Sequence, residues 1–213
     1  MAHEQSIEAA PRPNATDEAA LAEKLGSRIC HDLANPLMAI SNGIELLELA
    51  GFGTRPEEDM LVQTVKEARA RLDILRLAFG AGMDDSAQVA GRTVSQALLL
   101  MYRDRRLTPV WYPVSVPRAR AKLALLLMMC ADNGLPRGGT LDIRDTGGRI
   151  TLSAAQATPR DIAPLWALLC GKPGAAVPTA RDLHFALAAE TARALGMAIK
   201  VDVGNQNLSI SAA

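Results

Sequence analysis

SRICHDLANPL, residues 27–37, is the stretch from which the fold of this chain can be built outward. It sets His31, followed at once by the carboxylate of Asp32, inside a long helical pattern. Projected as a helix at about 100° per residue, the apolar positions gather on one side: Leu25, Ile29, Leu33, Pro36, Ile40, Ile44 and Leu47. His31 falls roughly opposite them, so we expect its imidazole to face water and to be available for chemistry.

The side chains around His31 suit a phosphoryl acceptor. Asp32 can hold one ring nitrogen as a donor and stabilise the positive charge that develops on the ring. Asn35, one turn on, can hydrogen-bond either group, and Pro36 can loosen the helix beside them. Five further residues share this face of the helix: Lys24, Ser27, Arg28, Met38 and Asn42. We expect the two cations to neutralise phosphoryl oxygens and the other three to contact a partner.

Composition narrows the class of protein. Of the 213 residues, 49% are hydrophobic and only 3% aromatic, and the formal net charge is zero, which gives no sign of a nucleic-acid partner. We expect no signal peptide, and the longest apolar run, residues 123–131, is too short to span a bilayer. Three cysteines without a CxxC pair suit reduced thiols. The expectation is a cytoplasmic protein without a membrane segment.

The three histidines show no metal-ligand spacing, so we expect no metal site. His184 falls on a helical stretch, residues 180–195, beside Phe185. A surface or packing role for His184 is a better expectation than catalysis.

Two long helices are expected after a flexible tail at residues 1–16. The first runs from Thr16 or Asp17 to Leu49, and Thr54 caps the second. The second carries its own apolar stripe, spaced alternately by four and three residues: Leu61, Val65, Ala68, Leu72, Leu75 and Phe79. Residues 17–82 thus form a helical hairpin that leaves apolar surface exposed. Two such hairpins would close into a four-helix bundle, which predicts a homodimer.

The second domain, residues 86–213, has a mixed pattern. It alternates helical segments with stretches typical of strands, which predicts an α+β sandwich with an open sheet covered by helices on one face. The expected helices are residues 89–105, 118–133, 161–170 and 180–195. The expected strands are residues 110–116 and two hairpins, 140–154 and 199–211.

The string His-Asp-Leu-x-Asn-Pro-Leu at residues 31–37 resembles the phosphoacceptor box of sensor histidine kinases. That box commonly reads His, acidic residue, Leu, two variable positions, Pro, Leu. Further positions make the chain similar to ChpT-type histidine phosphotransferases of alphaproteobacteria. They are residues 28–33, Pro36, residues 39–40, 42–43 and 45–48, and the stretch 131–140 with its sequence LPRGGT. The resemblance runs from about residue 20 to the C-terminus and is strongest in these two regions.

This resemblance implies a homodimeric four-helix bundle and a second domain like a histidine-kinase ATP-binding domain that has lost ATP binding. It implies a relay of phosphoryl groups between the receiver domain of a hybrid histidine kinase and those of response regulators. The receiver supplies its aspartate and Mg²⁺, so this chain would bind no cofactor of its own. Asn35 departs from the pattern, since a small hydroxyl residue is expected there in close relatives.

The sequence also argues against ATP as a ligand. Where a kinase carries paired asparagines to hold Mg²⁺, the stretch 122–134 offers only Asn133 near its end. Asp145-Thr146-Gly147-Gly148 lies within a predicted hairpin, where it is ordinary turn chemistry, and residues 171–174 are too poor in glycine for a lid. Two alternatives remain open: an ATP-dependent histidine kinase without a sensor, and a non-catalytic dimeric adaptor that binds a receiver domain.

Overall fold

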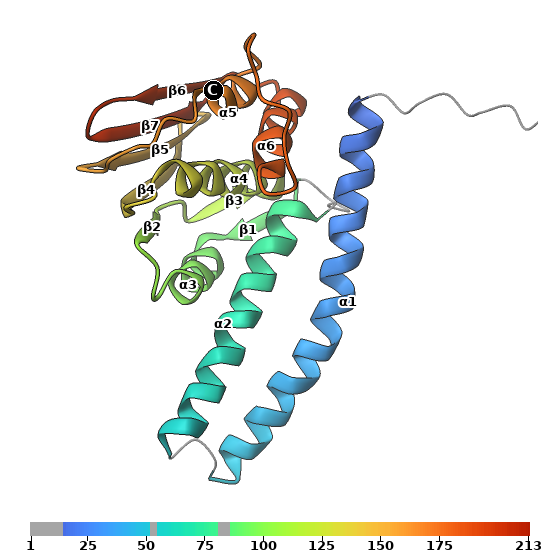
Figure 1. The fold of residues 1–213 in the computed structure, drawn as a ribbon. Helices are drawn as coiled ribbons and strands as arrows, with labels where there is room; N and C mark the ends of the chain where they lie inside the picture. The colour runs from blue at the N-terminus through green and yellow to red at the C-terminus, as the bar shows by residue number, and fades with distance from the viewer. Residues whose placement is uncertain (1–14, 52–54, 81–85) are drawn as a thin grey trace, which may run out of the picture.

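The computed structural model describes residues 15–51, 55–80 and 86–213, without the side chains of residues 15–24 and Ser27. A hairpin of two long helices, α1 (Ala15–Leu49) and α2 (Pro56–Phe79), stands beside a unit of sheet and shorter helices (Figure 1). The predicted α+β class is confirmed. Within the described residues, no helix has the length and apolar character needed to cross a membrane.

The start of α2 follows from its first residues. Pro56 opens the helix, where its missing N–H costs nothing, and Glu57, Glu58 and Asp59 face the positive end of the helix dipole. Glu58 also folds back onto the backbone N–H of Arg55, at 3.4 Å. The N-cap is therefore Arg55, not the predicted Thr54, which lies outside the described residues.

The predicted apolar stripe of α1 is not the surface that packs on α2. Of its seven residues only Ile44 is buried, while Leu25, Ile29, Leu33 and Ile40 are each at least half exposed. The other buried residues of the described part of α1 are Cys30 and Ser41. These positions lie about a quarter turn from the predicted stripe, which therefore runs along the hairpin unpartnered.

Helix α2 likewise buries residues that lie outside its predicted apolar stripe. None of the six residues of its predicted stripe is fully buried, and Leu61 is half exposed. The buried positions are Glu58, Val62, Ala70, Ile74 and Ala78. Ile74 and Ala78 belong to the core of the neighbouring α/β unit. Because that unit covers one side of α2, only another side is left for α1.

The α/β unit contains a five-stranded and a two-stranded sheet. The larger has the strand order β2-β4-β5-β7-β6, in which only β2 and β4 run parallel. Its strands are β2 (Leu107–Trp111), β4 (Gly139–Thr146), β5 (Arg149–Ala155), β6 (Ile199–Val203) and β7 (Asn207–Ala212). The smaller pairs β1 (Gln88–Ala90) with β3 (Ser115–Pro117). The helices are α3 (Gly91–Met101), α4 (Arg118–Gly134), α5 (Ala163–Leu169) and α6 (Leu183–Ala194).

The strand predicted at residues 110–116 is two strands in different sheets. Pro113 lies between β2 and β3 and has no N–H to donate to a strand ladder, so the chain leaves the large sheet there. The helix predicted from residue 89 starts at Gly91 instead. A β-carbon on Gly91 would lie 1.7 Å from the carbonyl oxygen of Pro113. Only glycine allows this close approach, and its N–H donates to the carbonyl of Val114 at 2.7 Å.

Helix α4 is the centre of the core. Leu123, Leu125, Leu126, Leu127 and Met128 have no exposed surface, because α4 is packed against the large sheet, α6 and α2 together. All-round burial explains why its residues show no polar face in this stretch.

One ion pair ties α4 to the sheet. Arg120 donates two hydrogen bonds to the carboxylate of Asp145, at 2.8 and 2.6 Å, and both side chains are largely buried. The pairing raises the pKa of Arg120. Asp145 lies in β4 rather than in the predicted turn, which consists of Gly147 and Gly148, both with positive φ.

Removing the carboxylate of this pair should destabilise the protein. We expect Asp145→Ala to lower the free energy of unfolding by about 1–2 kcal/mol, because it leaves a largely buried guanidinium without its partner. Urea denaturation checks this. The control is Glu190→Ala, which removes the partner of the well exposed Arg193 and should move the midpoint far less. Equal losses in both variants would contradict a structural role for the Arg120–Asp145 pair.

Candidate functional site

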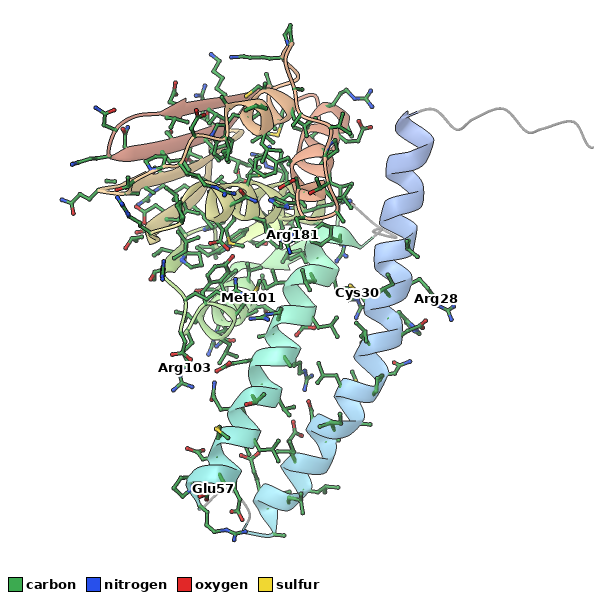
Figure 2. The ribbon with its side chains drawn as sticks, in the orientation of Figure 1. Arg28, Cys30, Glu57, Met101, Arg103 and Arg181 are labelled. Carbon is green, nitrogen blue, oxygen red and sulfur yellow. The ribbon has the colours of Figure 1, made fainter. Side chains whose placement is uncertain are left out.

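His31 projects from the outer side of α1. Its side chain is 68% exposed, whereas the preceding residue, Cys30, is buried. Figure 2 shows Cys30 on the side of α1 that faces α2 and Arg28 on the far side. Burial raises the pKa of the Cys30 thiol. Adjacent residues on a helix point about 100° apart, so the burial of Cys30 turns His31 toward water.

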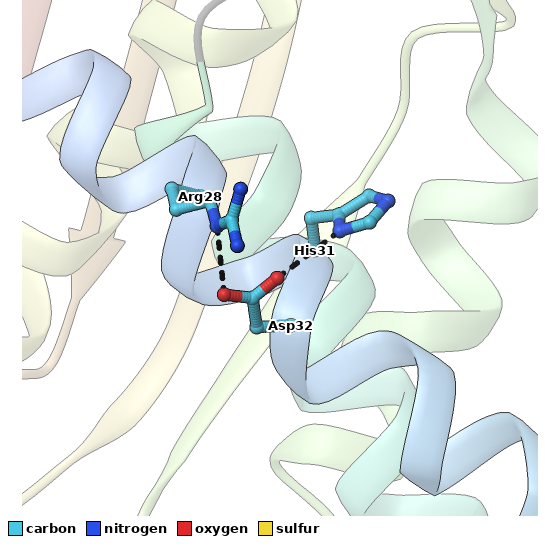
Figure 3. Close-up of polar contacts among 3 residues, drawn as sticks. All are labelled: Arg28, His31 and Asp32. Atoms are coloured by element: carbon cyan, nitrogen blue, oxygen red, sulfur yellow. Dashed lines mark hydrogen bonds and ion pairs between the residues drawn. The ribbon is translucent and has the colours of Figure 1, made fainter.

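Three side chains form a connected polar group on this face (Figure 3). Nδ1 of His31 lies 3.3 Å from Oδ1 of Asp32, and Nε of Arg28 donates to Oδ2 of Asp32 at 2.8 Å. Hydrogen bonds from Arg28 and, second, from His31 lower the pKa of the Asp32 carboxyl. Asp32 is therefore an anion throughout the neutral pH range.

The contact with Asp32 assigns roles to the two ring nitrogens of His31. A carboxylate only accepts hydrogen bonds, so this 3.3 Å contact favours the tautomer in which Nδ1 carries the proton. In the neutral ring Nε2 then holds the free lone pair. An exposed nitrogen with a lone pair, on a ring whose other nitrogen is held by an anion, can act as a nucleophile.

Pro36 affects the backbone at the same place. A residue at position 36 would normally donate its N–H to the carbonyl of Asp32, four residues earlier, but proline has no N–H. Helix α1 nevertheless continues through Pro36 to Leu49. The interruption in the backbone hydrogen bonds thus falls on the residue that holds the imidazole.

The structure brings only part of the predicted site together. Met38 and Asn42 are exposed and lie within about 20° of His31 around the helix. Asn35 is also exposed, but among the described residues it has no hydrogen bond to His31 or Asp32. The side chains of Lys24 and Ser27 lie outside the described residues, although both positions belong to α1.

Arg28 makes a contact that the sequence analysis did not predict, and its role toward phosphoryl oxygens stays a prediction. Its guanidinium was expected to neutralise phosphoryl oxygens, and the structure shows it bound to Asp32. The spacing of four residues between a cation and a carboxylate on one helix is a signal for this pairing.

Polar groups of the α/β unit that could have suggested a second site are engaged in internal contacts. Arg160 donates to the backbone carbonyl of Asn133 at 2.8 Å and also contacts its side-chain oxygen. His184 is half-buried beside Phe185, with ring centroids 4.7 Å apart, and burial lowers its pKa. The expectation of a packing role for His184 fits this position. In the described part of the chain, no group of three or more His, Cys, Asp or Glu side chains could hold a metal ion.

Comparison with known proteins identifies the α/β unit. The family model "Histidine phosphotransferase C-terminal domain" matches residues 91–207, more than half of the chain. The chain belongs to this family. The matched region begins at α3 and does not include His31, so the assignment of the acceptor rests on the residues and geometry of α1.

Two relatives extend this result. "Protein phosphotransferase ChpT" of Brucella abortus (strain 2308) is 34% identical over 128 residues, which are 58% of this chain. The match spans 59% of the length of that relative. The solved structure described as "1.7 Angstrom Structure of a Bacterial Phosphotransferase" is 26% identical, with a TM-score of 0.64. It covers 95% of this chain and 98% of the other, so both the hairpin and the α/β unit are included in the likeness.

The exposure of His31 predicts its chemical reactivity. With a limiting amount of diethyl pyrocarbonate, which modifies accessible neutral imidazoles, His31 should be modified before the half-buried His184. Peptide mass spectrometry at successive times measures the modification rates of His31 and His184. In urea the two histidines should react at similar rates, which is the control. Slower modification of His31 than of His184 in the folded protein would contradict the outward orientation.

Proposed function

We propose that this protein is a histidine phosphotransferase that relays a phosphoryl group between receiver domains through phospho-His31. The observation that carries the proposal is the exposed side chain of His31, whose Nδ1 lies 3.3 Å from Oδ1 of Asp32. Membership in the phosphotransferase family and the relatives of that kind support it.

In the first step, the lone pair of Nε2 attacks the phosphorus of an aspartyl phosphate on the upstream receiver. The Nε2–P bond forms, the bond from phosphorus to the aspartate oxygen breaks, and the aspartate leaves as a carboxylate. The proton on Nδ1 stays in place, and the anionic Asp32 stabilises the positive charge that the ring gains. The second step reverses these bonds on another receiver.

The receivers are proposed to be those of a hybrid histidine kinase and of response regulators, and each would bring its own Mg²⁺ to the phosphoryl group. The exposed face around His31, with Met38 and Asn42, would form the docking surface. Lys24 and Ser27 would extend this surface toward the N-terminus, and Asn35 would lie at its centre. The α/β unit would add contact area and thereby partner choice.

Neither bound ATP nor a cofactor enters this proposal. Two side chains were considered in the sequence as possible nucleotide ligands, and both bind other residues of the chain. Asp145 pairs with Arg120, and Asn133 pairs with Arg160. The proposed location is the cytoplasm, where this protein would reach the receiver domains of a hybrid histidine kinase and of response regulators.

A transfer assay tests the acceptor. With a receiver domain carrying radiolabelled aspartyl phosphate and Mg²⁺, the wild type should become labelled and His31→Ala should lose all labelling. Binding of the receiver by His31→Ala, measured by calorimetry, is the control for folding. Three results would overturn the proposal: labelling of His31→Ala, self-labelling from ATP alone as in a kinase, and receiver binding without transfer as in an adaptor.

We also propose that residues 17–82 form a dimerisation and phosphoacceptor hairpin that pairs with a second copy in a four-helix bundle, while α2 also packs into the core of the unit at residues 86–213. The apolar stripe of α1 supports this, since Leu25, Ile29, Leu33 and Ile40 are half exposed in a single chain. Contiguous apolar patches of this kind usually mark an interface. The stripe lies away from His31, so both histidines of a dimer would remain exposed.

A pair of matched variants tests the dimer. Ile40 and Met38 are exposed to the same degree, 52% and 50%, but only Ile40 lies on the apolar stripe. Ile40→Lys should convert the dimer to a monomer at micromolar concentration, because it places a charge in the bundle core. Met38→Lys should leave the dimer intact. Analytical ultracentrifugation measures both, and a monomeric wild type would refute the proposed bundle.

A further inference from the structure

Asp32 needs a restraint to hold the imidazole. His31 and Asp32 are neighbours in sequence, and on a helix such neighbours diverge by about 100° and do not face each other. The Asp32 side chain is 52% exposed, and its contact with Nδ1 is 3.3 Å long, beyond the usual range for hydrogen bonds. A free carboxylate in this position would rotate into water for much of the time.

Arg28 is placed to supply the restraint. It lies one turn before Asp32, and around the helix axis its position falls between those of Asp32 and His31. Its Nε donates to Oδ2 of Asp32 at 2.8 Å, while Oδ1 of the same carboxylate faces the imidazole. Figure 3 shows the carboxylate bound on one side by the guanidinium and on the other by the ring. The cation therefore draws the carboxylate toward the histidine.

We propose that Arg28 is a positioning residue: by holding Oδ2 of Asp32, it keeps Oδ1 on Nδ1 of His31 and so presents Nε2 to the incoming phosphoryl group. The inference rests on the proposed function, and it replaces direct neutralisation of phosphoryl oxygens as the role of Arg28. The effect of Arg28 on transfer then passes entirely through Asp32.

A double-mutant cycle separates the two roles. Initial rates of transfer from a labelled receiver are measured for the wild type, Arg28→Ala, Asp32→Asn and the double variant. Asp32→Asn should slow transfer at least about tenfold. Arg28→Ala should slow it about two- to threefold, as suits an exposed pair four residues apart. The double variant should transfer no more slowly than Asp32→Asn alone. A decrease in rate equal to the product of the two single decreases would overturn the proposal.

Matched variants complete the cycle. Arg28→Lys keeps a cation at the same spacing and should restore part of the rate, although a single ammonium lacks the planar geometry of the guanidinium. Asp73→Asn and Arg92→Ala change exposed residues of α2 and α3 and should transfer at the wild-type rate. Failure of Arg28→Lys to exceed Arg28→Ala would contradict an electrostatic restraint.

A measurement without any receiver keeps this inference separate from the proposed function. The ¹⁵N resonances of His31 report which ring nitrogen carries the proton. In the wild type Nδ1 should be protonated and Nε2 free, and Arg28→Ala should shift the ring toward a mixture of the two tautomers. An unchanged tautomer would refute the positioning role, whereas absence of transfer in the wild type would refute the proposed function alone.

Discussion

The burial of Ile74 and Ala78 of α2 in the core of the α/β unit is the constraint on which the rest of the structure depends. It fixes α2 against α3 and α4 and leaves another side of α2 for α1. The two helices of the hairpin approach closely at Gly26, where a β-carbon would lie 3.1 Å from the carbonyl of Phe79. This packing turns Cys30 inward, and His31 therefore points outward.

The candidate site depends on the rest of the protein mainly for the rotation of α1 about its own axis, which points His31 outward. Arg28, His31 and Asp32 lie on one turn of one helix, and all three side chains are more than half exposed. Water weakens each of these contacts, so each contributes little to the stability of the fold. Among the described residues none encloses the His31 side chain, which is 68% exposed.

The α/β unit belongs to a phosphotransferase family, and two pairs of its polar side chains make internal contacts. Arg120 and Asp145 join α4 to β4, and Arg160 is bound to Asn133 near the end of α4. These contacts join α4 to its neighbours, and α2 anchors the hairpin in the same core.

The sequence by itself determined the two long helices, the α+β class, and the presence of His31 and Asp32 on one polar face, because helical periodicity and capping are local properties. It could not determine which apolar row of α1 meets α2. That choice depends on Gly26, Cys30 and Ile44 fitting against a helix whose other side is already buried, and the row with the larger side chains stays exposed. Likewise, the spacing of Arg28 and Asp32 allowed an ion pair, but only the folded arrangement placed both Arg28 and His31 on the same carboxylate. Long-range packing decided the rotation of α1, since the side that meets α2 carries Cys30 and Ser41 and is not the most apolar side of the helix.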